Sequence, residues 1–118
     1  MNKRILIVDD DVDIIEPLSL LLERKGYTIA SITKGKEIYE RVKNFKPDLI
    51  LLDILMSGSD GRVICKRLKK DQLTKKITII MMSAHPGADK DSERAGADDF
   101  IAKPFEVEDL FTILQKYS

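Results

Sequence analysis

The chain has 118 residues, of which 43% are hydrophobic and 34% charged, which suits one folded domain with its own core. Its 20 basic and 20 acidic residues cancel, which argues against a nucleic-acid-binding protein, although a local basic patch is still allowed. The single cysteine, Cys65, excludes an internal disulfide framework and a cysteine-based zinc cluster. The N-terminal apolar run is too short for a signal peptide or a membrane span. We therefore expect a cytoplasmic protein with no membrane contact.

The first half of the chain alternates short apolar runs with segments of helical periodicity. Residues 5–8 form an apolar run typical of a buried strand. A helix should follow, capped by Asp11 and stopped at Gly26, and Pro17 inside it should cause a local kink. The next expected elements are a strand, a helix and a strand, at residues 28–32, 38–45 and 49–53.

The second half continues this alternation. Residues 56–61 have the composition of a turn. The polar segment 86–96 has few apolar anchors and predicts a short, weakly packed helix. The other expected elements are a helix around residues 63–68, strands at 77–82 and 99–102, and a helix around 107–114.

Five strands that alternate with five helices predict a parallel sheet covered on both faces. At this size we expect an α/β, flavodoxin-like, doubly wound five-stranded sheet with strand order 2-1-3-4-5. The first and third strands are then neighbours, so that Asp9, Asp10 and Asp53 meet at the carboxyl edge of the sheet. Carboxylates gathered there repel one another and need a cation, for which Mg²⁺ is suited.

Short motifs carry a more specific signal, because they occur in a fixed order and mostly at strand ends. They are Ile7-Val8-Asp9-Asp10, Leu51-Leu52-Asp53, Gly58 with Asp60-Gly61, Ser83-Ala84 and Lys103-Pro104-Phe105. Each motif is weak alone. Together they resemble the receiver domain of two-component response regulators over essentially the whole chain, residues 1–118.

The resemblance implies a role for each matching residue. Asp53 is the expected phosphoryl acceptor, and the expected Mg²⁺ ligands, with Mn²⁺ as an alternative ion, are Asp9, Asp10, Asp53 and the backbone carbonyl of Leu55. The expected phosphate-contacting and switch residues are Ser83, Lys103 and Phe100. The resemblance also implies a cis peptide bond between Lys103 and Pro104, and influence of Leu55 and His85 on the lifetime of the phosphoryl group.

A receiver domain of this kind is a signalling switch, with only self-phosphorylation and self-dephosphorylation activity. The implied donor is a sensor histidine kinase or a phosphotransfer protein, and the implied readout is a protein-interaction surface. An output protein of unknown identity, or a homodimer through the fourth helix, fifth strand and fifth helix, would use that surface. We expect no direct contact with nucleic acid.

Two other functions fit some of the same residues. An aspartate-nucleophile phosphatase or phosphotransferase would also use strand-end carboxylates and Mg²⁺, but such enzymes usually have a second aspartate where this chain has Leu55. A pure interaction module would keep the fold without phosphorylation, and the intact acidic set argues against it.

The chain departs from the family pattern at two positions. Ser57 stands where the family often has proline, and Phe100 lacks the hydroxyl of a tyrosine. The charged run at residues 66–76 is interpreted as a solvated helix face and Cys65 as a core residue. We expect a single domain with no output domain after it, as a stand-alone receiver or as the receiver of a longer regulator.

Overall fold

The computed structural model describes residues 3–117 and shows five parallel strands in one sheet, in the order β2-β1-β3-β6-β7. These strands are β1 (Arg4–Val8), β2 (Thr28–Ile32), β3 (Leu49–Asp53), β6 (Thr78–Ser83) and β7 (Asp99–Ala102). Counted along the chain without the short hairpin β4–β5, this is the expected order 2-1-3-4-5. The flavodoxin-like fold predicted from the sequence is therefore confirmed.

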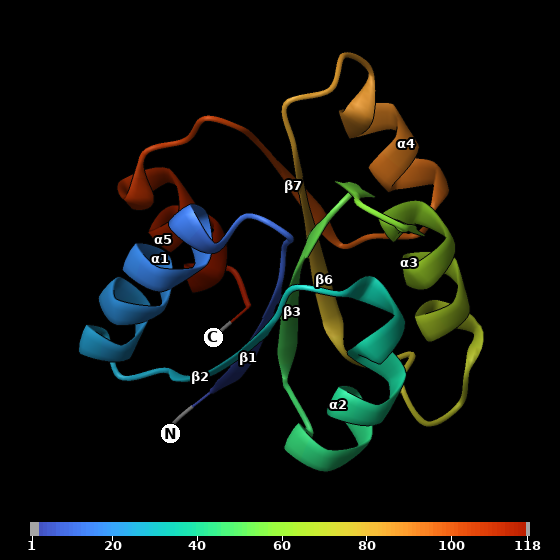
Figure 1. Ribbon diagram of the computed structural model, residues 1–118, viewed down its shortest axis with the longest axis horizontal. Helices are drawn as coiled ribbons and strands as arrows, with labels where there is room; N and C mark the ends of the chain where they lie inside the picture. Colours follow the sequence, from blue (N-terminus) through green and yellow to red (C-terminus); the bar gives the residue numbers. More distant parts are fainter. Residues whose placement is uncertain (1–2, 118) are drawn as a thin grey trace.

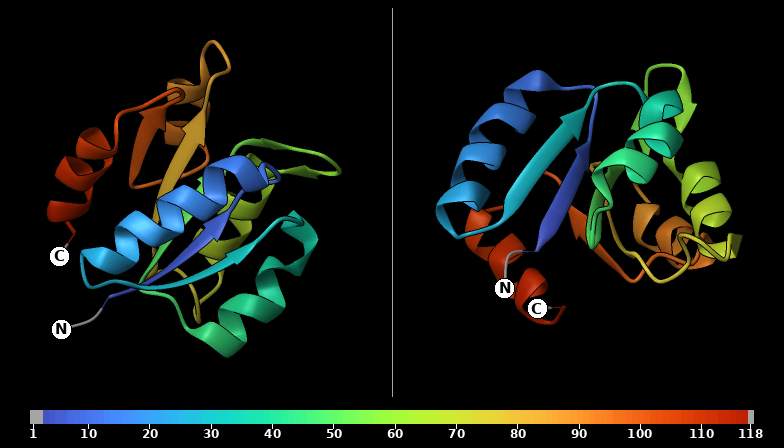
Figure 2. Two further views of the ribbon diagram at one scale, coloured as in Figure 1. Left: turned by 60° about the vertical axis from the view of Figure 1, so that its left-hand side comes forward. Right: turned by 90° about the horizontal axis from the view of Figure 1, so that it is seen from below.

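Helices cover both faces of the sheet (Figure 1 and Figure 2). They are α1 (Val12–Arg24), α2 (Ile38–Phe45), α3 (Gly61–Lys70), α4 (Ala88–Arg94) and α5 (Val107–Gln115), with a 3₁₀ turn at Gly35–Glu37 before α2. Helices α1 and α5 pack on one face, and α2, α3 and α4 pack on the other. This is the arrangement that right-handed βαβ crossovers produce.

Alternation along the strands explains the two cores. Leu6 and Val8 of β1 point to the α2–α4 side, whereas Ile5 and Ile7 point to the α1–α5 side. All five residues of β3 are buried, because this central strand has a neighbour on each edge and helices on both faces. The strand ends that carry the expected site are thus fixed by the best-packed part of the molecule.

Helix α1 begins as the sequence indicates. The Asp11 side chain caps it by accepting a hydrogen bond from the Asp13 N–H at 3.0 Å. The helix continues through Pro17 to Arg24, so proline does not end it. Gly26 follows with φ +99°, a conformation that favours glycine.

The main difference from the expected elements is a small hairpin. Its strands are β4 (Leu55–Met56) and β5 (Ser59–Asp60), joined by Ser57 and Gly58, where the sequence indicated only a turn. Strands of two residues are too short to produce an alternating apolar pattern. Smaller differences are that α3 begins earlier, at Gly61 after its cap Asp60, and that β6 extends to Ser83.

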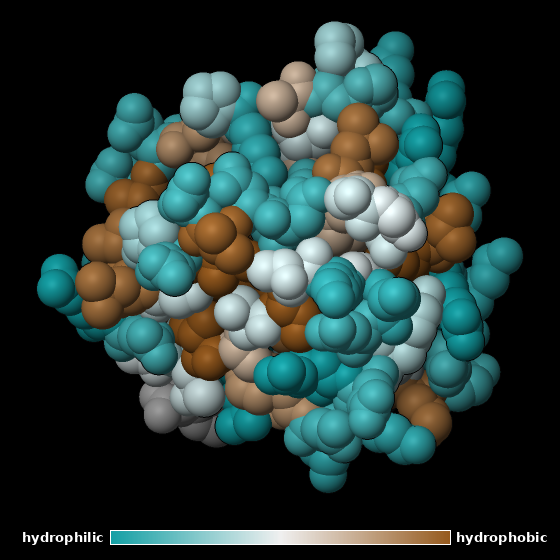
Figure 3. All heavy atoms as spheres, viewed as in Figure 1, coloured by the Kyte–Doolittle hydropathy of each residue, from teal (hydrophilic) through white to brown (hydrophobic). Residues whose placement is uncertain are grey.

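Helix α4 is short, as expected, and it buries only small side chains, those of Ala88 and Ser92. The surface mixes hydrophilic and hydrophobic residues, and hydrophobic side chains are visible on the flank where α1 and α5 lie (Figure 3). Among residues 3–117, no helix combines the length and the apolar character that crossing a bilayer requires.

Gly61 ties the hairpin and α3 to the end of β3. A Cβ atom at this position would collide with the backbone carbonyl oxygen of Asp53 and would lie 2.9 Å from the Cα of Ile54. Because both neighbours are backbone atoms, neither can move away cheaply. We expect Gly61→Ala to lower the free energy of unfolding by about 3 kcal/mol, as measured by urea denaturation.

Gly26→Ala is the matched control for this substitution. Its Cβ would meet open space, so that only the positive φ of Gly26 adds strain, at about 1 kcal/mol. Equal losses of stability in the two variants would contradict the close approach of α3 to Asp53.

Candidate functional site

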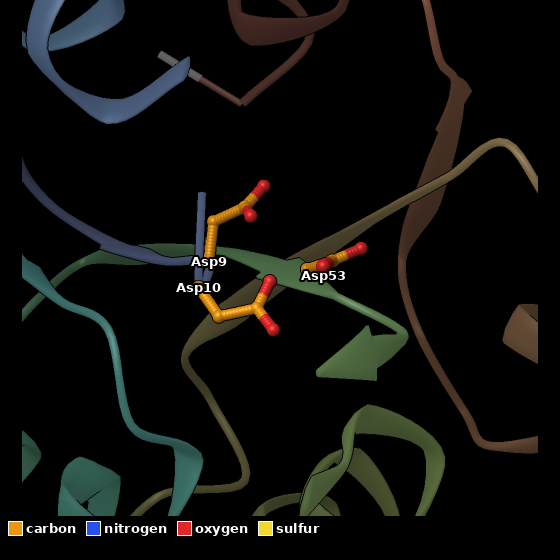
Figure 4. A group of neighbouring side chains, drawn as sticks. All are labelled: Asp9, Asp10 and Asp53. Atoms are coloured by element: carbon orange, nitrogen blue, oxygen red, sulfur yellow. The ribbon is translucent and has the colours of Figure 1, made fainter. Parts of the chain in front are cut away.

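Three carboxylates converge where β1 and β3 end (Figure 4). Parallel pairing places Val8 opposite Leu52, and therefore brings Asp9 and Asp10 beside Asp53. One oxygen from each of the three carboxylates lies within 4.8 Å of the others. The register of two adjacent strands thus brings together residues that lie more than 40 positions apart in the sequence.

Asp9 is the most enclosed of the three, with no exposed surface. Its Oδ1 accepts a hydrogen bond from the Asp11 N–H at 3.0 Å, and its Oδ2 accepts one from Lys103 Nζ at 2.6 Å. A buried carboxylate needs such partners, because it has lost its hydration. Asp9 is therefore held in one orientation.

Lys103 supplies the positive charge from the loop after β7. Its Nζ also lies 3.4 Å from Asp53 Oδ1, its backbone N–H donates to the Ser83 carbonyl at 3.0 Å, and its peptide bond to Pro104 is cis. Burial alone would lower the pKa of Lys103, but the hydrogen bond and charge of Asp9, together with the charge of Asp53, outweigh burial and raise that pKa. The ammonium therefore stays charged at neutral pH.

Asp53 is only 6% exposed, and its environment disfavours the ionised form. Burial, followed by repulsion from Asp9, raises the pKa of Asp53 from 3.8 to about 6, against the opposing effect of Lys103. Three carboxylates with one ammonium leave the site short of positive charge. A second cation would correct this shortage.

The carboxylate geometry fits a small divalent cation. Mg²⁺ binds oxygen ligands at about 2.0–2.1 Å, so oxygens that share one ion lie within about 4.2 Å of each other. The observed spread of 4.8 Å approaches that limit. Leu55 lies in β4, two residues after Asp53, and its carbonyl stays a predicted ligand.

The expected switch residues gather beside this site. Ser83, Phe100 and Lys103 line one surface hollow of about 440 Å³, which also reaches the loop before α4. Ser83 is buried at the end of β6, and its Oγ accepts a hydrogen bond from the His85 N–H at 3.0 Å. Phe100 is half-buried in β7 and packs against the core on the α2–α4 side.

His85 lies near the site, but its side chain contacts Asp91 of α4 and none of the three carboxylates. Its exposed imidazole Nε2 is 3.7 Å from Asp91 Oδ2, and Arg62 Nη1 lies 3.5 Å from the same oxygen. These contacts link α3, the loop after β6 and α4. A role of His85 in the lifetime of a phosphoryl group stays a prediction.

Sequence reasoning missed a contact between the segment after β3 and the acidic cluster. The backbone N–H of Ser57 donates a hydrogen bond to Asp10 Oδ2 at 2.8 Å. The signal that could have revealed it is the Ser57-Gly58 pair, because a two-residue loop with glycine indicates a hairpin that folds back on itself.

Comparison with known proteins agrees with this geometry. Residues 5–115 match the family described as the response regulator receiver domain. The chain belongs to this family of signalling switches.

Two curated relatives are longer than this chain. The phosphate regulon transcriptional regulatory protein PhoB of Pseudomonas aeruginosa is 38% identical over 117 residues, covering 98% of this chain and 51% of PhoB. The alkaline phosphatase synthesis transcriptional regulatory protein PhoP of Bacillus subtilis is also 38% identical, over 89% of this chain and 44% of PhoP. The chain thus spans about half the length of these relatives.

Solved structures of receiver-sized proteins match over nearly their full length. A putative response regulator from Chloroflexus aurantiacus superposes with a TM-score of 0.93 at 34% identity, covering 99% of this chain and 98% of that one. The chemotaxis protein CheY4 of Vibrio cholerae superposes with a TM-score of 0.90 at 25% identity, over the whole of both chains. These matches agree with the fold found for residues 3–117.

The raised pKa of Asp53 predicts a pH-dependent cost to stability in metal-free protein. Between about pH 4 and pH 6 the folded state binds more protons than the unfolded state, so stability falls as the pH rises through this interval. At pH 7 the full cost is present, and Asp53→Asn removes the buried charge. We expect this substitution to raise the free energy of unfolding by about 1–3 kcal/mol, measured by urea denaturation with a chelator.

This gain should disappear at about pH 3, where Asp53 is largely protonated in both states because both of its pKa values, 3.8 and about 6, lie above that pH. Asp109→Asn, at an exposed position of α5, is the control and should change little at either pH. An Asp53→Asn variant that is no more stable than wild type at pH 7 would contradict the charge imbalance.

Proposed function

We propose that Asp53 accepts a phosphoryl group from the phosphohistidine of a sensor histidine kinase or phosphotransfer protein. The observation that carries the proposal is the position of Asp53 beside Asp9 and within 3.4 Å of Lys103 Nζ at the end of the central strand. One oxygen of Asp53 forms the new O–P bond while the P–N bond of phosphohistidine breaks. The histidine nitrogen keeps the electron pair of that bond.

Charge placement is the main contribution of the protein to this step. A carboxylate that approaches a phosphoryl group brings two anions together, so nearby positive charge lowers the barrier. Lys103 supplies one such charge, and its hydrogen bond to Asp9 holds the ammonium in place. Asp9, Asp10, Asp53 and the Leu55 carbonyl would hold Mg²⁺ or Mn²⁺, which when bound supplies further positive charge to the phosphoryl oxygens.

The phosphoryl group would be read by the hollow next to the site. Ser83 sits on the same edge as Asp53, because β6 pairs with β3, and its hydroxyl would donate a hydrogen bond to a phosphoryl oxygen. Its loop and Phe100 line the same hollow, so movement of the loop gives Phe100 room to change rotamer. The affected surface comprises α4, β7 and α5, which would contact an output protein or a second copy of the chain.

The partners that we propose are proteins. Some relatives are named as DNA-binding, such as the master transcriptional regulator RpaA of Synechocystis, of which this chain covers 45%. For the receiver domain itself we propose no direct contact with nucleic acid, in keeping with a formal net charge of zero. The proposed compartment is the cytoplasm, where a kinase and its phosphohistidine would be accessible. Beyond gaining and losing its own phosphoryl group, the domain would turn over no substrate.

Intact-mass measurement tests the acceptor directly. Incubation with a small phosphodonor and Mg²⁺ should add the mass of one phosphoryl group to wild type, and Asp53→Asn should gain none. Asp10→Asn should be phosphorylated at least about tenfold more slowly, because loss of a metal ligand weakens Mg²⁺ binding.

Asp109→Asn serves as the control, because it removes an exposed carboxylate far along the chain from the acidic cluster, and it should be modified like wild type. Modification of Asp53→Asn to the same extent as wild type, or modification that does not need a divalent cation, would overturn the proposal.

A further inference from the structure

The loop of the hairpin β4–β5 contributes a backbone group that contacts the acidic cluster directly. The Ser57 N–H donates to Asp10 Oδ2 at 2.8 Å, joining residues that are 47 positions apart. Asp9 and Asp53 are buried among their partners, but Asp10 is exposed. An exposed aspartate would otherwise rotate freely, so this hydrogen bond defines where the third carboxylate of the cluster points.

The hairpin β4–β5 fixes the donor. Ser57 is the second residue of the turn Met56-Ser57-Gly58-Ser59, whose third residue, Gly58, has φ +79°. This is the backbone of a type II turn, in which glycine suits the third position and proline is common at the second. The N–H of Ser57 therefore belongs to a tight hairpin that starts two residues after Asp53.

We infer that the Ser57 backbone N–H is a positioning group for the cation site: it orients Asp10 and so raises the affinity of the domain for Mg²⁺. This inference rests on the proposed function, which places Mg²⁺ between Asp9, Asp10 and Asp53. A carboxylate has two oxygens and about four acceptor sites, so one amide bond to Oδ2 leaves room for a cation. Groups that orient metal ligands in this way typically change metal affinity by about 10–100-fold.

Competition between the Ser57 N–H and the cation for Asp10 would have the opposite effect on Mg²⁺ affinity. If the amide merely occupied Asp10 and competed with the cation, its removal would strengthen Mg²⁺ binding. The 2.8 Å bond to an anion that faces two further carboxylates favours the positioning role, because the partial positive charge of the N–H offsets part of their mutual repulsion.

Ser57→Pro isolates the N–H, because proline suits the turn but has no amide proton. Ser57→Ala is the matched control, since it removes the hydroxyl and keeps the N–H. We expect the dissociation constant for Mg²⁺, measured by titration of amide ¹H–¹⁵N NMR spectra without any phosphodonor, to rise about tenfold in Ser57→Pro. Ser57→Ala should bind Mg²⁺ within about twofold of wild type, because its positioning N–H is intact.

A second measurement excludes a simple distortion of the loop. In metal-free protein the Ser57 amide proton should shift downfield through its bond to Asp10, and Asp10→Asn should move that resonance upfield. Unchanged or tighter Mg²⁺ binding in Ser57→Pro, or a Ser57 resonance that ignores Asp10→Asn, would overturn the inference. Absence of Mg²⁺ binding in wild type would instead overturn the proposed function.

Discussion

Three carboxylates and one ammonium share the carboxyl edge of the sheet, and this imbalance of charge governs the site. Asp9 takes the shorter contact with Lys103, at 2.6 Å, and Asp53 takes the longer one, at 3.4 Å. Of these two carboxylates Asp53 has the weaker contact with the lysine, and its burial, followed by repulsion from Asp9, raises its pKa to about 6. A site arranged in this way costs stability when empty of cations and favours any ligand that brings positive charge.

The buried strands below these carboxylates hold them together in spite of this loss of stability. The central strands β1 and β3 are almost wholly buried, and their parallel pairing fixes the separation of Asp9 and Asp53. Helices on both faces bury the strands that lead to the site. At the edge of the sheet, Asp10 is exposed to solvent. The same sheet presents Ser83 and Lys103 from β6 and the loop after β7, so that groups from two further elements lie on the same edge as Asp53.

Much of this arrangement was predictable from particular residues. The apolar runs that end at Asp9 and Asp53 indicated parallel strands, and the rule that such strands place their ligands at the carboxyl edge brought the acids together. The resemblance to receiver domains predicted that Ser83 and the Lys-Pro-Phe motif belong to the site, and in the structure Ser83 and Lys103 lie at that edge. The position of these residues at the sheet edge could be predicted because it depends on residue types and on their spacing along the chain.

Contacts made by the backbone were not predictable in the same way. The Ser57 N–H that reaches Asp10, and the fit of Gly61 against the Asp53 carbonyl, depend on the path of a two-residue hairpin whose strands are too short to show periodicity. Lys103 is shared unequally between Asp9 and Asp53, at 2.6 and 3.4 Å, and this small difference in distance depends on the exact course of the backbone. Residue types alone indicate a lysine near acids, but not which acid it neutralises.

The central claim, that Asp53 ionises reluctantly because it is buried beside a second carboxylate, can be measured at the atom itself. A ¹³C NMR titration of the Asp53 side-chain carboxyl in metal-free protein should give a pKa of about 6, and saturating Mg²⁺ should lower that value clearly. An ordinary aspartate pKa near 4 in metal-free protein, or a value that Mg²⁺ leaves unchanged, would contradict the account.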